Sequence, residues 1–142
     1  MRVLVINGPN LNMLGIREPE IYGRKTFDDL QAYIRASAEA LGIRVTLFQS
    51  NHEGAIVDMI QQAMGHYDGI LINPAAYTHT SVAILDALKA IQIPTVEVHL
   101  SDVDTREPFR RFSYVSLYAQ KRICGKGFEG YAEGLMWLKD NC

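Results

Sequence analysis

Cysteine is scarce in this sequence, and long apolar runs are missing. Cys124 and Cys142 are the only cysteines among 142 residues. Two thiols in these positions do not make a disulfide framework, and no Cys/His spacing resembles a zinc site. The apolar runs have the length of strands. The first of them, residues 3–6, is too short for a signal-peptide core or a membrane span.

A large charge of either sign is also missing, because the formal net charge is -2. This balance gives no support for a nucleic-acid partner or a membrane-binding surface. With so few thiols, we expect a reduced, cytoplasmic, metal-free protein. The length suffices for one compact domain, and no linker or repeat divides the chain, so residues 1–142 are predicted to form a single domain.

What the sequence does contain is an alternation of strand-like runs with helical patterns. Short apolar runs predict buried parallel strands at residues 2–6, 44–48, 69–72 and 95–98, with a weaker candidate at 115–118. Between and after them, apolar residues recur with the helical period at residues 27–41, 56–64, 82–91 and 131–138. Residues 26–29 and 50–53 both resemble capping boxes, with an acid three residues after a hydroxyl.

Strands that alternate with helices predict right-handed βαβ units and a parallel sheet. We therefore expect an α/β protein, a flavodoxin-like three-layer sandwich around a five-stranded parallel sheet. Ligands of such sheets bind beyond the carboxyl ends of the strands. Polar residues follow each of the four clearer strands, at 7–12, 49–52, 73–81 and 99–102, and they include three of the four histidines. These four clusters favour a ligand site at one edge of the sheet.

Several common motifs are missing at this edge. No Gly-x-Gly-x-x-Gly or phosphate-loop pattern follows the first strand, and no Gly-x-Ser-x-Gly elbow exists. Neither cysteine lies at a predicted strand end, and carboxylates are sparse there, which disfavours acyl-enzyme and metal chemistry. What remains is histidines, neutral amides and a tyrosine near an arginine. That set suits proton transfer with stabilisation of a developing oxyanion.

Each of these candidates also has a structural interpretation. His79 could be a surface or helix-start residue, His99 a buried residue with satisfied hydrogen bonds, and His52 part of a capping sequence. Asn73 could belong to a plain turn or could bind a carboxylate or oxyanion. A solvated face could be formed by Arg106, Arg110 and Arg111. Alternatively, Arg106 and Arg110, which are four residues apart on a short helix, could share a side that faces the site.

Residues 7–23 form a long connection between the first strand and the first helical pattern. Structureless loops beyond about 12–15 residues are uncommon and often functional. This one holds three asparagines with Arg17 and Tyr22, so we interpret it as an active-site loop whose later part closes as a lid. Tyr22 could also be an aromatic that packs on the helices. Its use as a base would require a nearby cation and a closed, water-excluding loop.

Six ordered motifs resemble those of type II 3-dehydroquinate dehydratases. They lie at residues 7–12, 17–19 with 22–23, 48–54, 77–81, 96–101 and 106–110, and the resemblance covers residues 2 to about 138. It implies a hydro-lyase that converts 3-dehydroquinate to 3-dehydroshikimate and water in the shikimate pathway of aromatic amino-acid biosynthesis. It also implies no cofactor, no metal, and a homo-oligomer that is a dodecamer built from trimers.

By similarity to this family, Tyr22 is the base that takes a proton from the carbon next to the ketone. Arg17 supports the tyrosinate, and the enolate is stabilised near Asn10. His99 is the acid that protonates the departing hydroxyl, with Glu97 as its orienting partner.

Six more residues are implied in substrate binding. The substrate carboxylate would be held by Asn73 and the backbone around Leu100 and Ser101. The ring hydroxyls would be bound by His79, Arg110 and Asp86. In this family the residue at the Asp86 position reaches the site of a neighbouring subunit.

Five positions depart from the pattern that we expect of this family. Gly, Arg, Asn, His and Leu are expected where this sequence has Ala75, Leu85, Asp102, Phe112 and Lys126. An alanine at position 75 costs on the order of 1 kcal/mol if that position has a positive φ. The leucine next to Asp86 is expected to change the subunit contact. None of these departures removes a proposed catalytic group.

Two other classes of protein share the predicted fold. A flavodoxin-like module that binds flavin or a small ligand without catalysis would need a phosphate-binding loop after the first strand, and this loop is missing. A receiver-like signalling domain would need an Asp at a strand end, where the third strand has Asn73.

Overall fold

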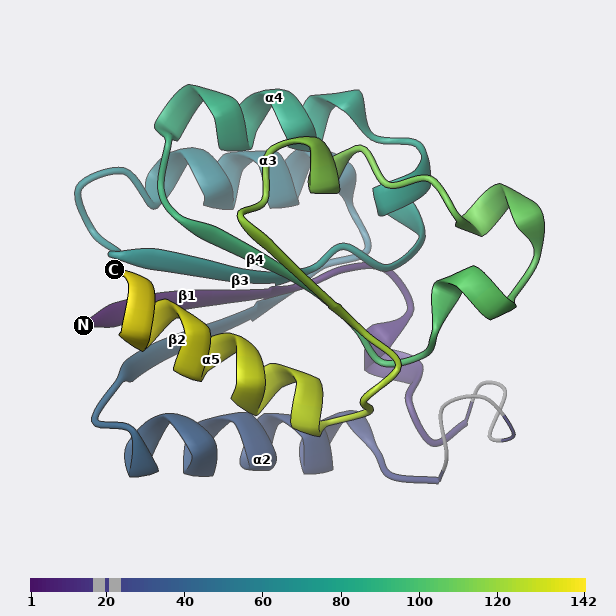
Figure 1. Cartoon of the computed structure of the whole chain (residues 1–142), viewed down its shortest axis with the longest axis horizontal. Helices are drawn as coiled ribbons and strands as arrows, with labels where there is room; N and C mark the ends of the chain where they lie inside the picture. The colour runs from purple at the N-terminus through teal and green to yellow at the C-terminus, as the bar shows by residue number, and fades with distance from the viewer. Residues whose placement is uncertain (17–19, 21–23) are drawn as a thin grey trace.

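A five-stranded, all-parallel sheet forms the middle layer of the computed structural model, which describes residues 1–16, 20 and 24–142 (Figure 1). The strands lie in the order β2-β1-β3-β4-β5. Their bounds are Arg2–Asn7 for β1, Arg44–Gln49 for β2, Gly69–Asn73 for β3, Thr95–His99 for β4 and Lys121–Cys124 for β5. The predicted α/β three-layer sandwich with five parallel strands is confirmed. The burial predicted for residues 44–48 is wrong, because β2 lies at an edge of the sheet and none of its residues is fully buried.

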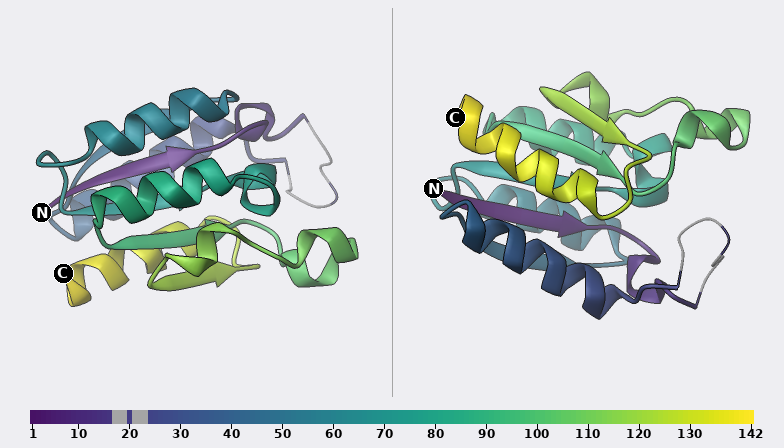
Figure 2. Two further views of the ribbon diagram at one scale, coloured as in Figure 1. Left: turned by 90° about the horizontal axis from the view of Figure 1, so that it is seen from above. Right: turned by 60° about the horizontal axis from the view of Figure 1, so that its bottom comes forward.

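Two helices cover each face of the sheet (Figures 1 and 2). On one face lie α2 (Phe27–Ala40) and α5 (Glu129–Asn141), and on the other α3 (Glu53–Gln62) and α4 (Val82–Ile91). Each pair closes its own apolar layer against the sheet. Five 3-10 turns complete the described part of the chain: η1 (Leu11–Met13), η2 (Ala75–His79), η3 (Val103–Thr105), η4 (Pro108–Arg110) and η5 (Val115–Leu117).

The first four strands each run one residue further than the apolar pattern predicts. The added residues are all polar: Asn7, Gln49, Asn73 and His99. The backbone ladder continues through them, since Asn7 pairs in register with Gln49 on one side and Asn73 on the other. Each of these polar side chains therefore stands on the last position of a strand, at the carboxyl edge of the sheet.

The weak strand predicted at residues 115–118 is wrong. Those residues form η5, and the fifth strand is Lys121–Cys124. This strand lies at the edge of the sheet and buries only Ile123, so it lacks the continuous apolar run of a central strand. Because the fifth strand was misplaced, one cysteine does lie at a strand end, contrary to expectation: Cys124 ends β5. Burial raises the pKa of its thiol to about 11, which makes it a poor nucleophile.

One of the two predicted capping boxes is confirmed. Thr26 Oγ1 accepts from the backbone N–H of Asp29, and the Asp29 carboxylate accepts from that of Thr26. The box predicted at residues 50–53 is wrong, because Ser50 Oγ accepts from the His52 N–H in a turn before the helix. His52 is the N-cap of α3 and makes no capping hydrogen bond through its side chain.

Helix α5 approaches the sheet closely through two glycines on one face. A Cβ on Gly134 would lie 2.6 Å from Leu71 Cδ1, and one on Gly130 would lie 3.1 Å from Val98 Cγ2. The same face buries Tyr131, Leu135 and Leu138 completely. In the described part of the chain, no helix has both the length and the apolar character needed to cross a membrane.

We expect Gly134→Ala to lower the free energy of unfolding by about 1–3 kcal/mol, because the new methyl group overpacks the core at Leu71. Urea unfolding measures this change. Gly54→Ala in α3 is the matched control, since a Cβ there meets nothing within 4 Å. The control substitution should raise the free energy of unfolding by up to about 1 kcal/mol, because alanine has a higher helix propensity than glycine. Equal effects of the two substitutions would contradict the close packing of α5.

Candidate active site

A cavity opens at the carboxyl edge of the sheet, beyond the ends of β1, β3 and β4. Both termini of the chain lie at the opposite end of the molecule (Figures 1 and 2). Three segments line the cavity: the connection after β1, the end of β3 with η2, and the segment after β4. The lining residues are Pro9, Asn10, Leu11, Met13, Leu14, Asn73, Ala75, Ala76, His79, His99, Leu100, Ser101, Val103, Arg106 and Arg110.

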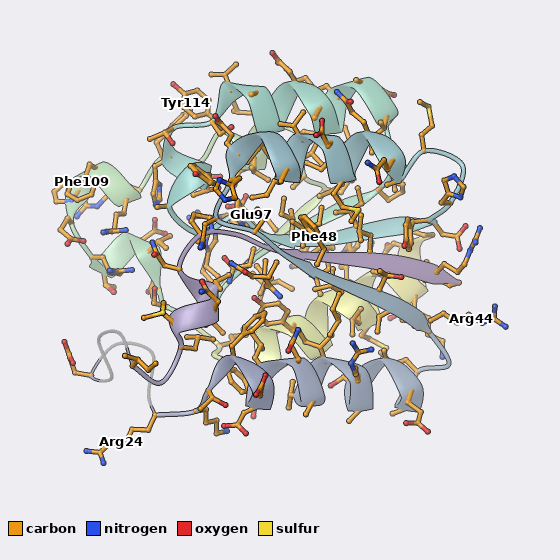
Figure 3. All side chains as sticks on the ribbon, turned by 180° about the vertical axis from the view of Figure 1, so that it is seen from behind. Arg24, Arg44, Phe48, Glu97, Phe109 and Tyr114 are labelled. Atoms are coloured by element: carbon orange, nitrogen blue, oxygen red, sulfur yellow. The ribbon has the colours of Figure 1, made fainter. Side chains whose placement is uncertain are left out.

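The structure brings seven of the predicted site residues together on this cavity: Asn10, Asn73, His79, His99, Leu100, Ser101 and Arg110. Glu97 lies behind His99, in the interior near the end of the sheet (Figure 3). Asp86 is exposed on α4 and does not line the cavity of its own chain. Arg17 and Tyr22 lie outside the described residues.

His99 and Glu97 form a buried pair on the same face of β4. His99 Nε2 lies 2.5 Å from Glu97 Oε2, and the side chains are 5% and 0% exposed. A carboxylate accepts, so Nε2 carries the hydrogen in this bond. The other ring nitrogen, Nδ1, has no hydrogen-bond partner within the described part of the chain. The pair therefore presents one nitrogen of a fixed imidazole to the cavity.

Three hydroxyl groups complete the surroundings of the Glu97 carboxylate. Thr78 and Ser113 donate to Oε2 at 3.0 and 2.9 Å, and Ser116 donates to Oε1. Arg122 on β5 adds a positive charge, with Nε 3.9 Å from Oε2. None of these four residues was predicted to have a role. They come from η2, the η5 region and the edge strand, and no spacing pattern in the sequence points to their meeting.

The environment of Glu97 keeps it ionised. Burial by itself raises the pKa of the carboxyl group, but the hydrogen bond and charge of His99, followed by the hydroxyls of Ser116 and Ser113, lower it to about 2. A buried carboxylate with this many donors is held in one orientation. Glu97 therefore fixes the ring of His99 as well as opposing its charge.

The second histidine of the cavity, His79, has a different environment. Its Nδ1 lies 2.8 Å from the Phe112 carbonyl oxygen, which only accepts, so Nδ1 carries a hydrogen. Burial lowers the pKa of His79 and outweighs the hydrogen bond to the Phe112 carbonyl, which raises it; the charges of His99 and Arg110 lower it further. In the neutral form that this favours, Nε2 is an acceptor. His79 is thereby suited to bind a hydroxyl group.

The start of the long connection is held against the loop after β2. Asn10 has a left-handed backbone with φ of 69°, and its N–H donates to Asn51 Oδ1 at 2.9 Å. Gln49 Nε2 donates to the Gly8 carbonyl at 3.1 Å and to Asn51 Oδ1 at 3.2 Å. Asn51 carries no role in the sequence analysis, yet it fixes the backbone at Asn10.

The arginines after β4 do not share one short helix as predicted. Arg106 follows η3, whereas Arg110 ends the separate turn η4. Both nevertheless line the cavity, and Arg111 does not. Arg110 Nε lies 2.7 Å from Glu107 Oε2, which holds this guanidinium beside the opening. Figure 3 shows Phe109, from the same turn, on the outer side of this segment.

The polar groups of the cavity are of a kind suited to hydrogen bonding and proton transfer. Within residues 1–16, 20 and 24–142, no group of three or more His, Cys, Asp or Glu side chains is placed to hold a metal ion. His52 is exposed and lies off the cavity. The cavity instead offers imidazole, amide and guanidinium groups, which can donate, accept and transfer protons.

The sequence matches the family model described as "Dehydroquinase class II" over residues 1–139. The chain belongs to the class II dehydroquinase family. A 3-dehydroquinate dehydratase of Geotalea daltonii is 57% identical over 135 residues, which are 95% of this chain and 94% of that protein. A catabolic 3-dehydroquinase of Aspergillus clavatus is 59% identical over 129 residues, covering 91% of this chain and 86% of that protein.

A solved structure agrees with these relatives. The crystal structure of a type II dehydroquinase from Butyrivibrio crossotus has a TM-score of 0.95 at 48% identity, with 97% of each chain covered. The predicted family and its flavodoxin-like fold are thus confirmed. The two relatives carry names of hydro-lyases, the enzyme class predicted from the sequence.

The structure accounts for the expected cost at one departure from the family pattern. Ala75 has φ of 52°, in the left-handed region that favours glycine. At the other departures, Asp102 accepts from the Asp104 N–H, Lys126 pairs with Glu133 at 2.7 Å, and Leu85 is buried. The Phe112 ring packs edge-on against Tyr114 with centroids 4.9 Å apart.

We expect Ala75→Gly to raise the free energy of unfolding by about 0.5–1 kcal/mol. Removing the Cβ relieves the left-handed strain, and the greater freedom of glycine in the unfolded chain offsets part of that gain. Chemical denaturation measures the change. Ala76→Gly, at the next residue and without a positive φ, should instead destabilise. The expectation fails if both substitutions destabilise alike.

We expect acid to destabilise the wild-type protein more than Glu97→Gln. Because the pKa of Glu97 is lower when folded than the ordinary 4.5, its stabilising effect is complete above about pH 4.5 and is lost as the pH falls toward 2. Between about pH 6 and pH 3 the free energy of unfolding of the wild type should fall by about 2 kcal/mol more than that of the variant. Urea titrations at both pH values test this.

Glu107→Gln is the control for that comparison. Glu107 also has a lowered pKa, through a backbone hydrogen bond and Arg110, but its side chain is exposed. Its variant should therefore follow the wild-type acid dependence. Identical acid dependence of Glu97→Gln and the wild type would contradict the role of the buried carboxylate.

Proposed function

We propose that this protein catalyses the reversible conversion of 3-dehydroquinate to 3-dehydroshikimate and water, without a metal or cofactor. Membership of the class II dehydroquinase family supports this substrate. The observation that carries the proposal is the buried His99–Glu97 pair at the wall of the cavity, next to amide and guanidinium groups. One relative is named a catabolic 3-dehydroquinase, and the proposal concerns the reaction itself.

The reaction removes a proton from the carbon next to a ketone and a hydroxyl from the carbon after it. Proton removal sends the electron pair toward the ketone oxygen, which becomes an enolate. When the enolate collapses, the C–O bond breaks, and the hydroxyl takes a proton and leaves as water. The site must therefore supply a base, a ligand for the enolate oxygen and an acid.

His99 is the acid in this proposal. In this proposal His99 enters the step protonated on both ring nitrogens. Its Nε2–H is bonded to Glu97, so Nδ1–H is the group that hands its proton to the departing hydroxyl. The carboxylate opposes the charge of the ring and holds it in one orientation, as in other sites where an acid positions a histidine. The hydroxyls of Thr78, Ser113 and Ser116 in turn position Glu97.

Tyr22 is the proposed base, and Arg17 supports its ionised form. Both roles rest on the resemblance to the family. Both residues belong to the connection whose first part, from Pro9 to Leu14, lines the cavity. Asn10, from the same connection, is proposed to stabilise the enolate.

The remaining lining residues supply substrate contacts in this proposal. The Asn73 amide and the backbone at Leu100 and Ser101 bind the carboxylate. His79, as an acceptor at Nε2, and Arg110 bind ring hydroxyls. Each of these five residues lines the cavity.

We also propose that the protein is a cytoplasmic dodecamer of trimers in which Asp86 completes the site of a neighbouring subunit. The exposure of Asp86, outside the cavity of its own chain, supports that role. The low number of cysteines supports the location.

Purified protein should convert 3-dehydroquinate to an enone that absorbs in the near ultraviolet, with no metal or nucleotide added. His99→Gln and Tyr22→Phe should each lower kcat by at least about 100-fold, because each removes a proton-transfer group. Circular dichroism establishes that the variants fold, and light scattering of the same samples gives the assembly size. Absence of turnover by folded wild-type protein would rule out the proposed reaction.

His52→Gln is a matched control for His99→Gln. This histidine follows β2 at the same edge of the sheet, but it is exposed and does not line the cavity. Its variant should keep nearly full activity. Substantial turnover by Tyr22→Phe would remove tyrosine as the base while leaving the reaction itself in place.

A further inference from the structure

Tyr131 lies in the first turn of α5 and is completely buried, yet its hydroxyl reaches the carboxyl edge of the sheet. The hydroxyl donates to Asn7 Oδ1 at 2.6 Å and accepts from Asn73 Nδ2 at 2.9 Å. Asn7 and Asn73 pair in register at the ends of β1 and β3, so one hydroxyl can contact both. This phenol is therefore bonded directly to an amide that lines the cavity.

The direction of each hydrogen bond in this network is fixed by a backbone group. The Ala75 N–H donates at 3.1 Å to Asn73 Oδ1, so the oxygen of the Asn73 amide must face Ala75. Its NH2 group must then face Tyr131, and the Tyr131 oxygen accepts. The phenol is left to donate its own hydrogen to Asn7 Oδ1.

The Asn7 side chain contributes to this network at a cost in stability. The Asn7 side chain is fully buried, and its Nδ2 has no hydrogen-bond partner among the described residues. A buried donor without a partner destabilises the fold. Among the described residues, the Asn7 side chain makes one hydrogen bond in return, in which its Oδ1 accepts from the Tyr131 hydroxyl.

We propose that Tyr131 is a positioning residue for substrate binding. It holds the Asn73 amide so that the second hydrogen of Nδ2 is available to an anionic oxygen in the cavity, the substrate carboxylate. The proposal rests on the proposed function, since that function supplies the carboxylate. Tyr131 itself lies outside the cavity lining and touches no reacting atom.

Tyr131→Phe should raise KM about tenfold and change kcat less than about twofold. A carboxylate contact is equally strong in the ground state and the transition state, so its weakening appears in KM. About tenfold is the effect of losing one hydrogen bond of ordinary strength. A merely structural role would lower the amount of folded enzyme, and hence apparent kcat, without changing KM.

Tyr118→Phe is the matched control. Its hydroxyl also donates one hydrogen bond, to the Ile93 carbonyl at 2.8 Å in a partly buried position, and Tyr118 does not line the cavity. This variant should lose stability with unchanged KM. A rise in KM of the same size in both variants would overturn the proposal.

A double variant separates stability from positioning. Tyr131→Phe leaves Asn7 with two unpartnered polar atoms, and Asn7→Leu removes both. The double variant Tyr131→Phe/Asn7→Leu should therefore have a higher unfolding midpoint than Tyr131→Phe, while its KM stays about tenfold above that of the wild type. Return of KM to the wild-type value in the double variant would show that Tyr131 acts through stability alone.

The orientation of Asn73 can be read without turnover. In 15N-labelled wild-type protein, one Nδ2 hydrogen of Asn73 should exchange slowly with solvent because it is bonded to Tyr131, and Tyr131→Phe should abolish this protection. Asn73→Asp assigns the signal by its absence. Unchanged protection in Tyr131→Phe overturns the proposal, whereas a wild type without turnover but with this protection overturns only the proposed function.

Discussion

The buried carboxylate of Glu97 is the constraint on which the rest of the site depends. A negative charge with no exposure to solvent has to be surrounded by donors, because an unpaired buried charge would be very costly. The donors come from His99 on the same strand and from hydroxyls on η2 and the η5 region. Satisfying one charge thus fixes the imidazole of the cavity and also ties two irregular segments to β4.

A second polar network surrounds Asn73, at the end of the neighbouring strand β3. It differs from the first in being neutral and in having its direction set by the backbone N–H of Ala75. The two networks fix an imidazole and an amide by hydrogen bonds from behind, on the side away from the cavity. The ligand therefore meets groups whose orientation is already determined, which reduces the ordering that binding would otherwise require.

Much of this architecture could be predicted from the sequence, because the three inner strands, the edge strand β2 and the helical stripes contain enough apolar residues to leave clear signals. The other edge strand, β5, left none, since Ile123 follows two charged residues, whereas β2 contains Val45, Leu47 and Phe48. The polar residues at strand ends could be predicted as a cluster, but the partners of Glu97 could not. Thr78, Ser113 and Ser116 lie 16 to 19 positions from Glu97 in the sequence and contact it only in the folded protein. Local sequence patterns do not predict such contacts. The individual roles of the site residues came from the family resemblance.

The bond between Tyr131 and Asn7 spans 124 positions of the chain. During synthesis, β1, β3 and their polar ends emerge well before α5, so the Asn73 amide has no phenol partner until the final helix has docked. Long-range contacts of this kind form late because the intervening chain must first be ordered. Recognition of the ligand is thereby linked to completion of the fold, and a nascent or partly folded chain lacks an oriented amide at this position.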